Sequence, residues 1–220
     1  MSTGKTRVAV MISGRGSNMS ALIEAAKDND FPAEIVLVVS NKPAAAGLDI
    51  ARSHGIEAVA VDQKLFSSRE AHEEKVAEAI EASGARIVCL AGYMRLLTPR
   101  FVARFAGRMI NIHPSLLPLF PGLDTHRRAL EAGMRLHGCT VHFVTEEMDG
   151  GPIIAQAAIP VRPGDTIANL ENRLLAAEHR LYPHALRLVA SGRARMEGAR
   201  AIVDMEEADG AGLLMSPAAS

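Results

Sequence analysis

The sequence predicts an α/β fold of the Rossmann type: a single doubly wound, mostly parallel sheet with helices on both faces. Short runs rich in β-branched residues alternate with stretches of helical periodicity. These runs are continuously apolar rather than alternating, which is typical of parallel strands that helices cover on both faces. The chain has 220 residues, 48% of them hydrophobic, enough to build one substantial core.

The first half of the chain carries the βαβ pattern. Strands are predicted over residues 7–12, 34–39, 57–61 and 86–91. Helices are predicted over residues 18–27, 46–55 and 68–84. Ser68 is suited to cap the third helix, and Gly55 and Gly84 are suited to end the second and third.

The second half of the chain has a different pattern. Two strands, 136–145 and 152–161, are joined by the turn-like stretch "EEMDGG". A long amphipathic helix then begins at Asp165 or Thr166, and Pro183 is expected to kink or split it. Residues 204–220 lack periodicity and are expected to form a disordered tail. We therefore predict one domain, 1–203, followed by a tail.

Charge and cysteine content limit the classes of partner. The 24 basic and 25 acidic residues leave no basic surface for nucleic acid or membranes, so we expect small-molecule partners. Cys89 and Cys139 lie in apolar strand-like runs without C-x-x-C spacing, and no Cys/His pattern indicates a metal. No apolar run approaches the roughly 18 residues that a membrane span needs. We expect a cytoplasmic protein, either a monomer or a homodimer.

The stretch "SGRGSN", residues 13–18, lies between the first strand and the first helix. Gly14 and Gly16 allow backbone N–H groups to converge at a helix N-terminus, where a phosphate is favoured. The dinucleotide fingerprint is incomplete, because Met19 stands where its third glycine would be. The loop indicates a monophosphate site; the alternative is that the glycines only make a tight turn.

Asn111 and His113 lie two positions apart in the predicted strand "MINIH". Side chains at this spacing share a face, and Pro114 ends the strand beside them. An amide donor next to an imidazole at a strand's C-terminal end suits an oxyanion donor beside a general acid or base. The alternative is a core histidine whose hydrogen bonds are satisfied.

Asp149 lies in the turn "TEEMDGGP", which could fold back over the sheet edge. If so, its carboxylate would favour the protonated imidazole of His113; otherwise Asp149 is an ordinary turn residue. His142 shares a strand face with Thr140 and could support the site or be purely structural. The histidines on predicted helices are expected at the surface: His54, His72, His126 and His184.

Seven segments in unbroken order from Arg7 to Ser191 resemble the phosphoribosylglycinamide formyltransferase family. They are "SGRGSN", "SNKPAAAGLDIA", "FSSREAHE", "LAGYMRLLTPRFV", "INIHPSLLP", "PGLDTHRRAL" and "VHFVTEEMDGGPIIAQ". The motif "INIHPSLLP" alone is similar to the wider formyltransferase group, including formyltetrahydrofolate deformylase. The glycine loop and the "SNK" and "MDGGPII" neighbourhoods narrow the resemblance to the glycinamide branch.

The resemblance implies site residues by position. The catalytic trio is Asn111, His113 and Asp149. The glycinamide ribonucleotide site is Gly16, Ser17 and Asn18 in the N-terminal part of the domain, together with Glu178. The folate site is Arg69, Met94, Arg95, Leu96, Leu97, Asn111, Thr145, Glu146, Glu147, Met148 and Asp149. The chain departs from the family at Leu119, Phe120 and Asp124, where a basic residue, a tyrosine and a histidine are common.

The resemblance also implies the reaction. The formyl group of 10-formyltetrahydrofolate, the cosubstrate, would pass to the amine of glycinamide ribonucleotide in purine biosynthesis, with no metal. One alternative is a 10-formyltetrahydrofolate hydrolase that uses the same trio with water. Another is a non-catalytic phosphoribosyl- or folate-binding protein, which would have no reason to keep the trio together.

Overall fold

The computed structural model describes residues 4–204, so all but the first residue of the predicted tail 204–220 lies outside the described residues. Its main feature is a seven-stranded sheet in the order β3-β2-β1-β4-β5-β6-β7. The strands are β1 (Thr6–Ile12), β2 (Ala33–Ser40), β3 (Glu57–Ala60), β4 (Ile87–Leu90), β5 (Met109–His113), β6 (Leu136–Phe143) and β7 (Ile153–Pro160). The first five are parallel to one another, and β6 pairs antiparallel with both β5 and β7. The predicted mostly parallel α/β sheet is confirmed.

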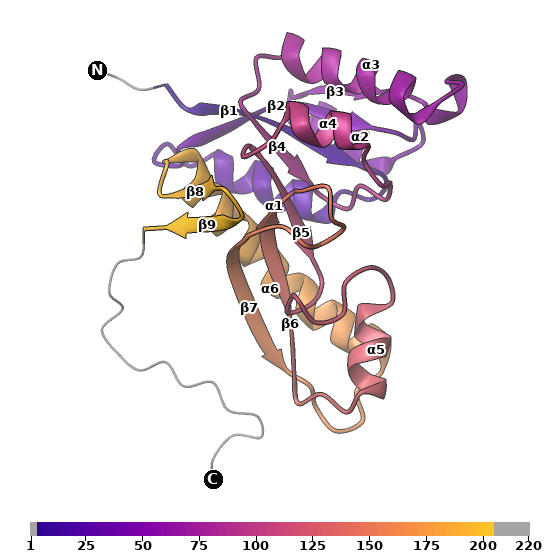
Figure 1. Cartoon of the computed structure of the whole chain (residues 1–220), viewed down its shortest axis with the longest axis vertical. Helices are drawn as coiled ribbons and strands as arrows, with labels where there is room; N and C mark the ends of the chain where they lie inside the picture. Colours follow the sequence, from indigo (N-terminus) through magenta and orange to yellow (C-terminus); the bar gives the residue numbers. More distant parts are fainter. Residues whose placement is uncertain (1–3, 205–220) are drawn as a thin grey trace.

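Helices cover both faces of the sheet (Figure 1). They are α1 (Ser17–Ala26), α2 (Ala46–Ser53), α3 (Arg69–Ala82), α4 (Pro99–Arg104), α5 (Thr125–Glu131) and α6 (Ile167–Ala190), with a 3-10 turn η1 (Gln63–Leu65). The core on one face includes apolar residues of α1, α2 and α6. The core on the other face includes residues of α3 and α4. Burial from both sides explains why the parallel strands are continuously apolar.

The helix ends follow the capping chemistry of the sequence. The Ser68 hydroxyl accepts the backbone N–H of Ala71 at 3.1 Å, and Gly84 closes α3 with a φ of 69°. Thr166 caps α6 by accepting the N–H of Asn169 at 3.2 Å. The predicted caps at Ser68 and Thr166 are confirmed.

α6 is one helix that continues through Pro183, so a split at this residue is wrong, whereas a kink stays a prediction. The neighbouring side chain explains the continuity. The buried Tyr182 hydroxyl lies 2.9 Å from the carbonyl oxygen of Leu90 and 3.2 Å from that of Ile110, which fixes α6 against β4 and β5. Packing therefore outweighs the one backbone hydrogen bond that proline cannot donate.

The sequence does not predict bounds for three short elements: α4, α5 and the hairpin of β8 (Ala194–Glu197) and β9 (Arg200–Val203). The hairpin forms its own two-stranded sheet, and β9 lies against β7. α5 lies beside the N-terminal part of α6 (Figure 1). α5 and the hairpin lie at the β6–β7 end of the molecule, whereas α4 packs against α3.

The histidines on helices are not all at the surface. His72 is fully buried, and its Nε2 lies 2.9 Å from the carbonyl oxygen of Val61, so its surface prediction is wrong. His126 is half-buried, whereas His54 and His184 are exposed as expected. His72 faces inward because α3 turns this position toward the segment that follows β3.

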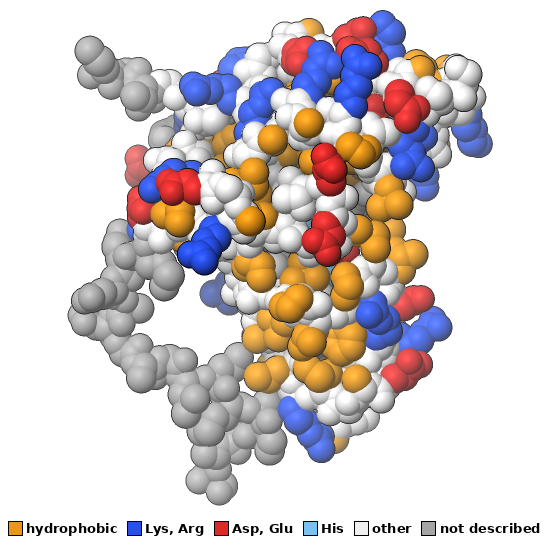
Figure 2. Space-filling view, viewed as in Figure 1, with side chains coloured by type: hydrophobic (Ala, Val, Ile, Leu, Met, Phe, Trp, Pro, Cys, Tyr) orange, Lys and Arg blue, Asp and Glu red, His pale blue; other side chains and the backbone are white. Residues whose placement is uncertain are grey.

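The surface carries charges of both signs. On the face in Figure 2, basic and acidic side chains are interspersed near α3, and hydrophobic side chains gather over the β6–β7 end. Within residues 4–204, no helix combines the length and the apolar character that crossing a membrane requires. Both cysteines are buried and free, as predicted.

Candidate functional site

β5 brings Asn111 and His113 to the end of the parallel part of the sheet. The strand ends at His113, immediately before Pro114, as the sequence predicts. In the antiparallel pairing with β6, Asn111 lies opposite His142 and His113 lies opposite Thr140. His113 is only 6% exposed, so its ring depends on protein partners for its hydrogen bonds.

Asp149 folds back onto His113. Its Oδ2 lies 3.4 Å from His113 Nδ1 and accepts the backbone N–H of Gly122 at 2.8 Å. Asp149 has a φ of 54°, a left-handed conformation that is uncommon for a residue with a side chain. Gly151 makes the turn possible, because a Cβ atom there would lie 1.7 Å from the carbonyl oxygen of Phe143. The expectation that the turn returns to the sheet edge is confirmed.

The second ring nitrogen of His113 also faces an acceptor. His113 Nε2 lies 3.0 Å from the carbonyl oxygen of Phe120, and a carbonyl can only accept, so Nε2 carries a proton. With a carboxylate at Nδ1, both nitrogens face acceptors. The arrangement is suited to the doubly protonated imidazolium.

His142 completes the cluster, although sequence reasoning left its role open. Its Nδ1 donates to the carbonyl oxygen of Phe143 at 2.9 Å, which leaves Nε2 to accept from Asn111 Nδ2 at 3.2 Å. Burial lowers the pKa of His142, so the neutral ring is the stable form. Its Nε2 is also 3.8 Å from Asp149 Oδ1. His142 therefore fixes the amide orientation of Asn111.

A hydrogen-bond clamp holds the loop that follows His113. The Thr140 hydroxyl donates to the carbonyl oxygen of Ser115 at 2.7 Å and accepts the N–H of Leu117 at 3.1 Å. Gln156 Nε2 donates to the carbonyl oxygen of Leu117 at 2.9 Å. The Ser115 hydroxyl donates to the carbonyl oxygen of Leu119 at 2.6 Å. These bonds position the loop so that the Phe120 carbonyl reaches His113.

The predicted ribonucleotide residues also come together. Gly16 caps α1 with a φ of 76°, and a Cβ atom there would lie 3.1 Å from the Cα of Gly47. Asn18 Nδ2 donates to Glu178 Oε2 at 2.7 Å, which joins α1 to α6. Asn18 Oδ1 is buried without a hydrogen-bond partner among the described residues, and burial raises the pKa of Glu178. The helix N-terminus, with Ser17 as its first residue, is thus a polar environment of the kind that suits an anionic ligand.

The predicted folate residues occupy two segments. Met94 and Leu96 expose 63% and 57% of their surface on the segment 94–97, whereas Leu97 packs against the core. Arg95 Nη1 is buried without a hydrogen-bond partner in the described part of the chain. The second segment, 145–149, follows β6, and Met148 is 55% exposed. Both segments present exposed apolar side chains.

Arg69 stands apart from the other predicted folate residues. It is exposed at the first turn of α3. Within residues 4–204 it makes no hydrogen bond or ion pair with the segment 94–97. The structure thus brings together the trio and the ribonucleotide set, and leaves Arg69 outside both clusters.

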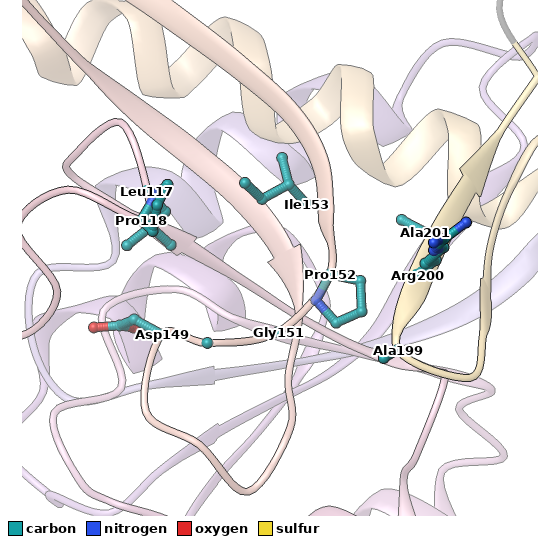
Figure 3. A pocket seen from close by; sticks show the side chains of 10 residues that line it. Leu117, Pro118, Asp149, Gly151, Pro152, Ile153, Ala199, Arg200 and Ala201 are labelled. Carbon is teal, nitrogen blue, oxygen red and sulfur yellow. The ribbon is translucent and has the colours of Figure 1, made fainter.

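A hollow of about 460 Å³ lies on the other side of the Asp149 turn (Figure 3). It is lined by Leu117, Pro118, residues 149–153 and residues 199–201. The Asp149 carboxylate points away from Ala199, Arg200 and Ala201 (Figure 3). The segment 94–97 does not line this hollow, which adjoins the trio from the side of the β8–β9 hairpin.

The fold and these clusters define an α/β protein with an amide, an imidazole and a carboxylate in one cluster and a glycine loop at the start of α1. A family model described as formyl transferase matches residues 6–186, a range that contains all three trio residues and the glycine loop. The chain belongs to the formyl transferase family.

Relatives of known name extend this result. The chain is 46% identical over 197 residues to phosphoribosylglycinamide formyltransferase of Escherichia coli (strain K12), covering 90% of this chain and 93% of that protein. It is similar to the crystal structure of glycinamide ribonucleotide transformylase 1 from Symbiobacterium toebii, with a TM-score of 0.88, 47% identity, and 90% and 94% of the two chains covered.

A second group of relatives is much longer. The chain is 50% identical over 192 residues to the trifunctional purine biosynthetic protein adenosine-3 of Bos taurus, which covers 87% of this chain. The match spans only 19% of that protein's length.

Proposed function

We propose that the protein transfers the formyl group of 10-formyltetrahydrofolate to the primary amine of glycinamide ribonucleotide. The products are formylglycinamide ribonucleotide and tetrahydrofolate, in purine biosynthesis. The observation that carries the proposal is the cluster of Asn111, His113 and Asp149, in which Asp149 Oδ2 lies 3.4 Å from His113 Nδ1. The relatives that share nearly their whole length with this chain support the choice of substrates.

The trio acts on charge that develops during the reaction. The amine attacks the formyl carbon and forms the new C–N bond, which places negative charge on the formyl oxygen. The free N–H of the Asn111 amide and an N–H of the His113 imidazolium are the donors for that oxygen. Asp149 favours the protonated ring and orients it.

Collapse of the intermediate breaks the bond between the formyl carbon and the folate nitrogen. A proton leaves the attacking amine, and one is delivered to the departing nitrogen; Asp149 is the group that can hold a water to relay it. In the present arrangement His113 Nε2 donates to the Phe120 carbonyl. Donation from Nε2 to the formyl oxygen therefore requires that carbonyl to be displaced.

Substrate positions follow from the two other clusters. We assign the ribonucleotide phosphate to the N–H groups at Gly16, Ser17 and Asn18, and the ribose to Glu178. We assign the folate to Asn111, Asp149 and the segments 94–97 and 145–148, with Arg69 at its periphery. Both sites lie in one domain, 1–203, of a cytoplasmic protein.

The test is incubation with 10-formyltetrahydrofolate with and without glycinamide ribonucleotide, following tetrahydrofolate and formylated ribonucleotide by chromatography. We expect tetrahydrofolate release to require the ribonucleotide, with one formylated product per tetrahydrofolate. Equal release without the ribonucleotide would assign the trio to hydrolysis. Binding of both compounds without turnover would leave a binding protein.

A further inference from the structure

Ser13 links the glycine loop to the segment 94–97 through one buried hydroxyl group. Ser13 is 5% exposed and is the first residue of the loop 13–18. Its hydroxyl donates to Asn41 Oδ1 at 2.6 Å and accepts the backbone N–H of Met94 at 2.8 Å. Its own backbone N–H donates to the carbonyl oxygen of Gly92 at 3.1 Å. Two backbone segments that are 81 residues apart are thus joined at one side chain.

The donor and acceptor roles in this series of hydrogen bonds are fixed by Asn41. Asn41 is 1% exposed, and its Nδ2 donates to Gln63 Oε1 at 2.8 Å, so its Oδ1 faces Ser13. An amide oxygen only accepts, so the Ser13 hydrogen points toward Asn41 and a lone pair remains for Met94. A change in the Ser13 side-chain rotamer would move the hydroxyl oxygen and break both bonds.

The two segments that Ser13 joins also make other contacts. The carbonyl oxygen of Gly14 accepts the N–H of Gly47 at 3.1 Å, and Gly16 packs against Gly47. At the opposite end, the Met94 side chain is 63% exposed while its backbone N–H is occupied by Ser13. A ligand that fixes the glycine loop therefore also fixes the backbone of residue 94.

We infer that Ser13 is a positioning residue that couples the two substrate sites: ribonucleotide bound at the glycine loop raises the affinity of the segment 94–97 for folate. The inference rests on the proposed function for the identity of both ligands. The first ligand reduces the motion of the Ser13–Met94 link that both segments share. The second ligand therefore loses less conformational entropy when it binds. The coupling is reciprocal, so folate raises ribonucleotide affinity by the same factor.

The experiment uses glycinamide ribonucleotide and tetrahydrofolate, a pair that cannot react because neither carries a formyl group. Calorimetry gives the Kd of tetrahydrofolate with and without saturating ribonucleotide. The affinity ratio is the Kd of tetrahydrofolate without ribonucleotide divided by its Kd with ribonucleotide. We expect this ratio to be at least about five in wild type and to approach one in Ser13→Ala. Ser20→Ala is the matched control, because the Ser20 hydroxyl donates to the Gly16 carbonyl and makes no bond to residue 94; its ratio should equal that of wild type.

Amide exchange at Met94 gives a second readout. Ribonucleotide alone should slow exchange of the Met94 N–H in wild type and leave it unchanged in Ser13→Ala. If Ser13→Ala does not fold, Gln63→Ala loosens Asn41 at a half-buried position and should lower the affinity ratio.

The outcomes separate this inference from the proposed function. Failure of the wild type to bind either compound overturns both. Separate binding of both compounds with a wild-type ratio of one overturns the coupling alone. A wild-type ratio preserved in Ser13→Ala, or in Gln63→Ala where the first variant does not fold, overturns the role of Ser13.

Discussion

His142 Nε2 accepts a hydrogen bond from Asn111 Nδ2 at 3.2 Å, across the antiparallel pairing of β5 with β6. Because His142 Nδ1 already donates to the Phe143 carbonyl, this histidine has one tautomer and one role at the site. The Asn111 oxygen therefore points elsewhere, and the second amide N–H remains for a ligand.

Replacement of His142 should impair turnover through Asn111. We expect His142→Phe to lower kcat about 10- to 100-fold, because the amide of Asn111 loses the acceptor that orients it. His142→Gln offers an amide oxygen at a similar position and should recover part of the loss. Steady-state kinetics measures both variants; normal turnover in His142→Phe would make the contact purely structural.

Asn111→Ala and His113→Ala should each lower kcat by about 10²–10³-fold, because both side chains act on charge that is present only in the transition state. Binding of tetrahydrofolate, measured by calorimetry, should stay within a few-fold of wild type. Asn172→Ala and His184→Ala, at exposed positions on α6, are the controls. A variant that lost binding and turnover equally would place that residue in ligand binding only.

Asp149→Asn keeps the shape of the turn residue and removes its charge. The amide oxygen can still accept the Gly122 N–H, but the His113 ring loses its anionic partner at Nδ1. We expect kcat to fall about 10- to 100-fold, as for a hydrogen bond to a charged group. Stability in urea should change little. Glu57→Gln, at an exposed position on β3, controls for the loss of one negative charge. Unchanged turnover in Asp149→Asn would reduce Asp149 to a turn residue.

The glycine loop should tolerate alanine at one glycine and not at the other. Gly16 has a φ of 76° and lies against Gly47, whereas a Cβ atom at Gly14 would meet open space. We expect Gly16→Ala to weaken ribonucleotide binding about tenfold or more, because a left-handed alanine is strained. Gly14→Ala and Arg15→Ala should remain within a few-fold of wild type, because main-chain donors hold the phosphate. Calorimetric titration of the ribonucleotide decides; a larger effect of Arg15→Ala would assign the phosphate to the side chain.

The sequence predicted the sheet and the pairing of Asn111 with His113 from short-range periodicity, whereas the place of Asp149 in the trio came from the resemblance to the family. Asn111 and His113 share a face by their spacing alone, and Pro114 marks the end of their strand. The role of His142 could not be predicted from the sequence, because it depends on which β6 residue lies opposite Asn111. That register is set by the antiparallel pairing of β5 with β6, two strands that are far apart in the sequence.

The sequence also did not predict which helix residues are buried or where the shortest strands lie. His72 is buried because the segment after β3 supplies an acceptor at Val61 and the ring of Phe66 packs edge-on at 5.4 Å. The sequence of α3 alone does not predict those partners, because they lie in another segment. The four-residue strands β8 and β9 are too short for alternation to be distinguished from chance. The affected residues lie outside the trio.

Stability should fall in mild acid because His137 is buried as a neutral ring. His137 is 1% exposed and lies edge-on to the ring of His126, with 5.1 Å between centroids. Burial lowers the pKa of His137 from 6.5 to about 4, and the neighbouring His126 acts in the same direction. The unfolded chain therefore binds this proton more readily than the folded protein between those two values. The stabilisation is complete above pH 6.5 and is lost as the pH falls toward 4, by roughly 1–3 kcal/mol for this one group.

Urea denaturation at pH 7.5 and pH 4.5 measures this difference. We expect His137→Phe to show a smaller loss of unfolding free energy between the two pH values than wild type, whatever its stability at pH 7.5, because its ring cannot take up a proton. A residual loss should remain, since burial also lowers the pKa of His142 and His72. His184→Gln, at an exposed position, should show the wild-type difference. If His137→Phe and wild type lost the same free energy between pH 7.5 and 4.5, acid sensitivity would have to come from other groups, and His137 would have to be protonated in the folded protein near its ordinary pKa.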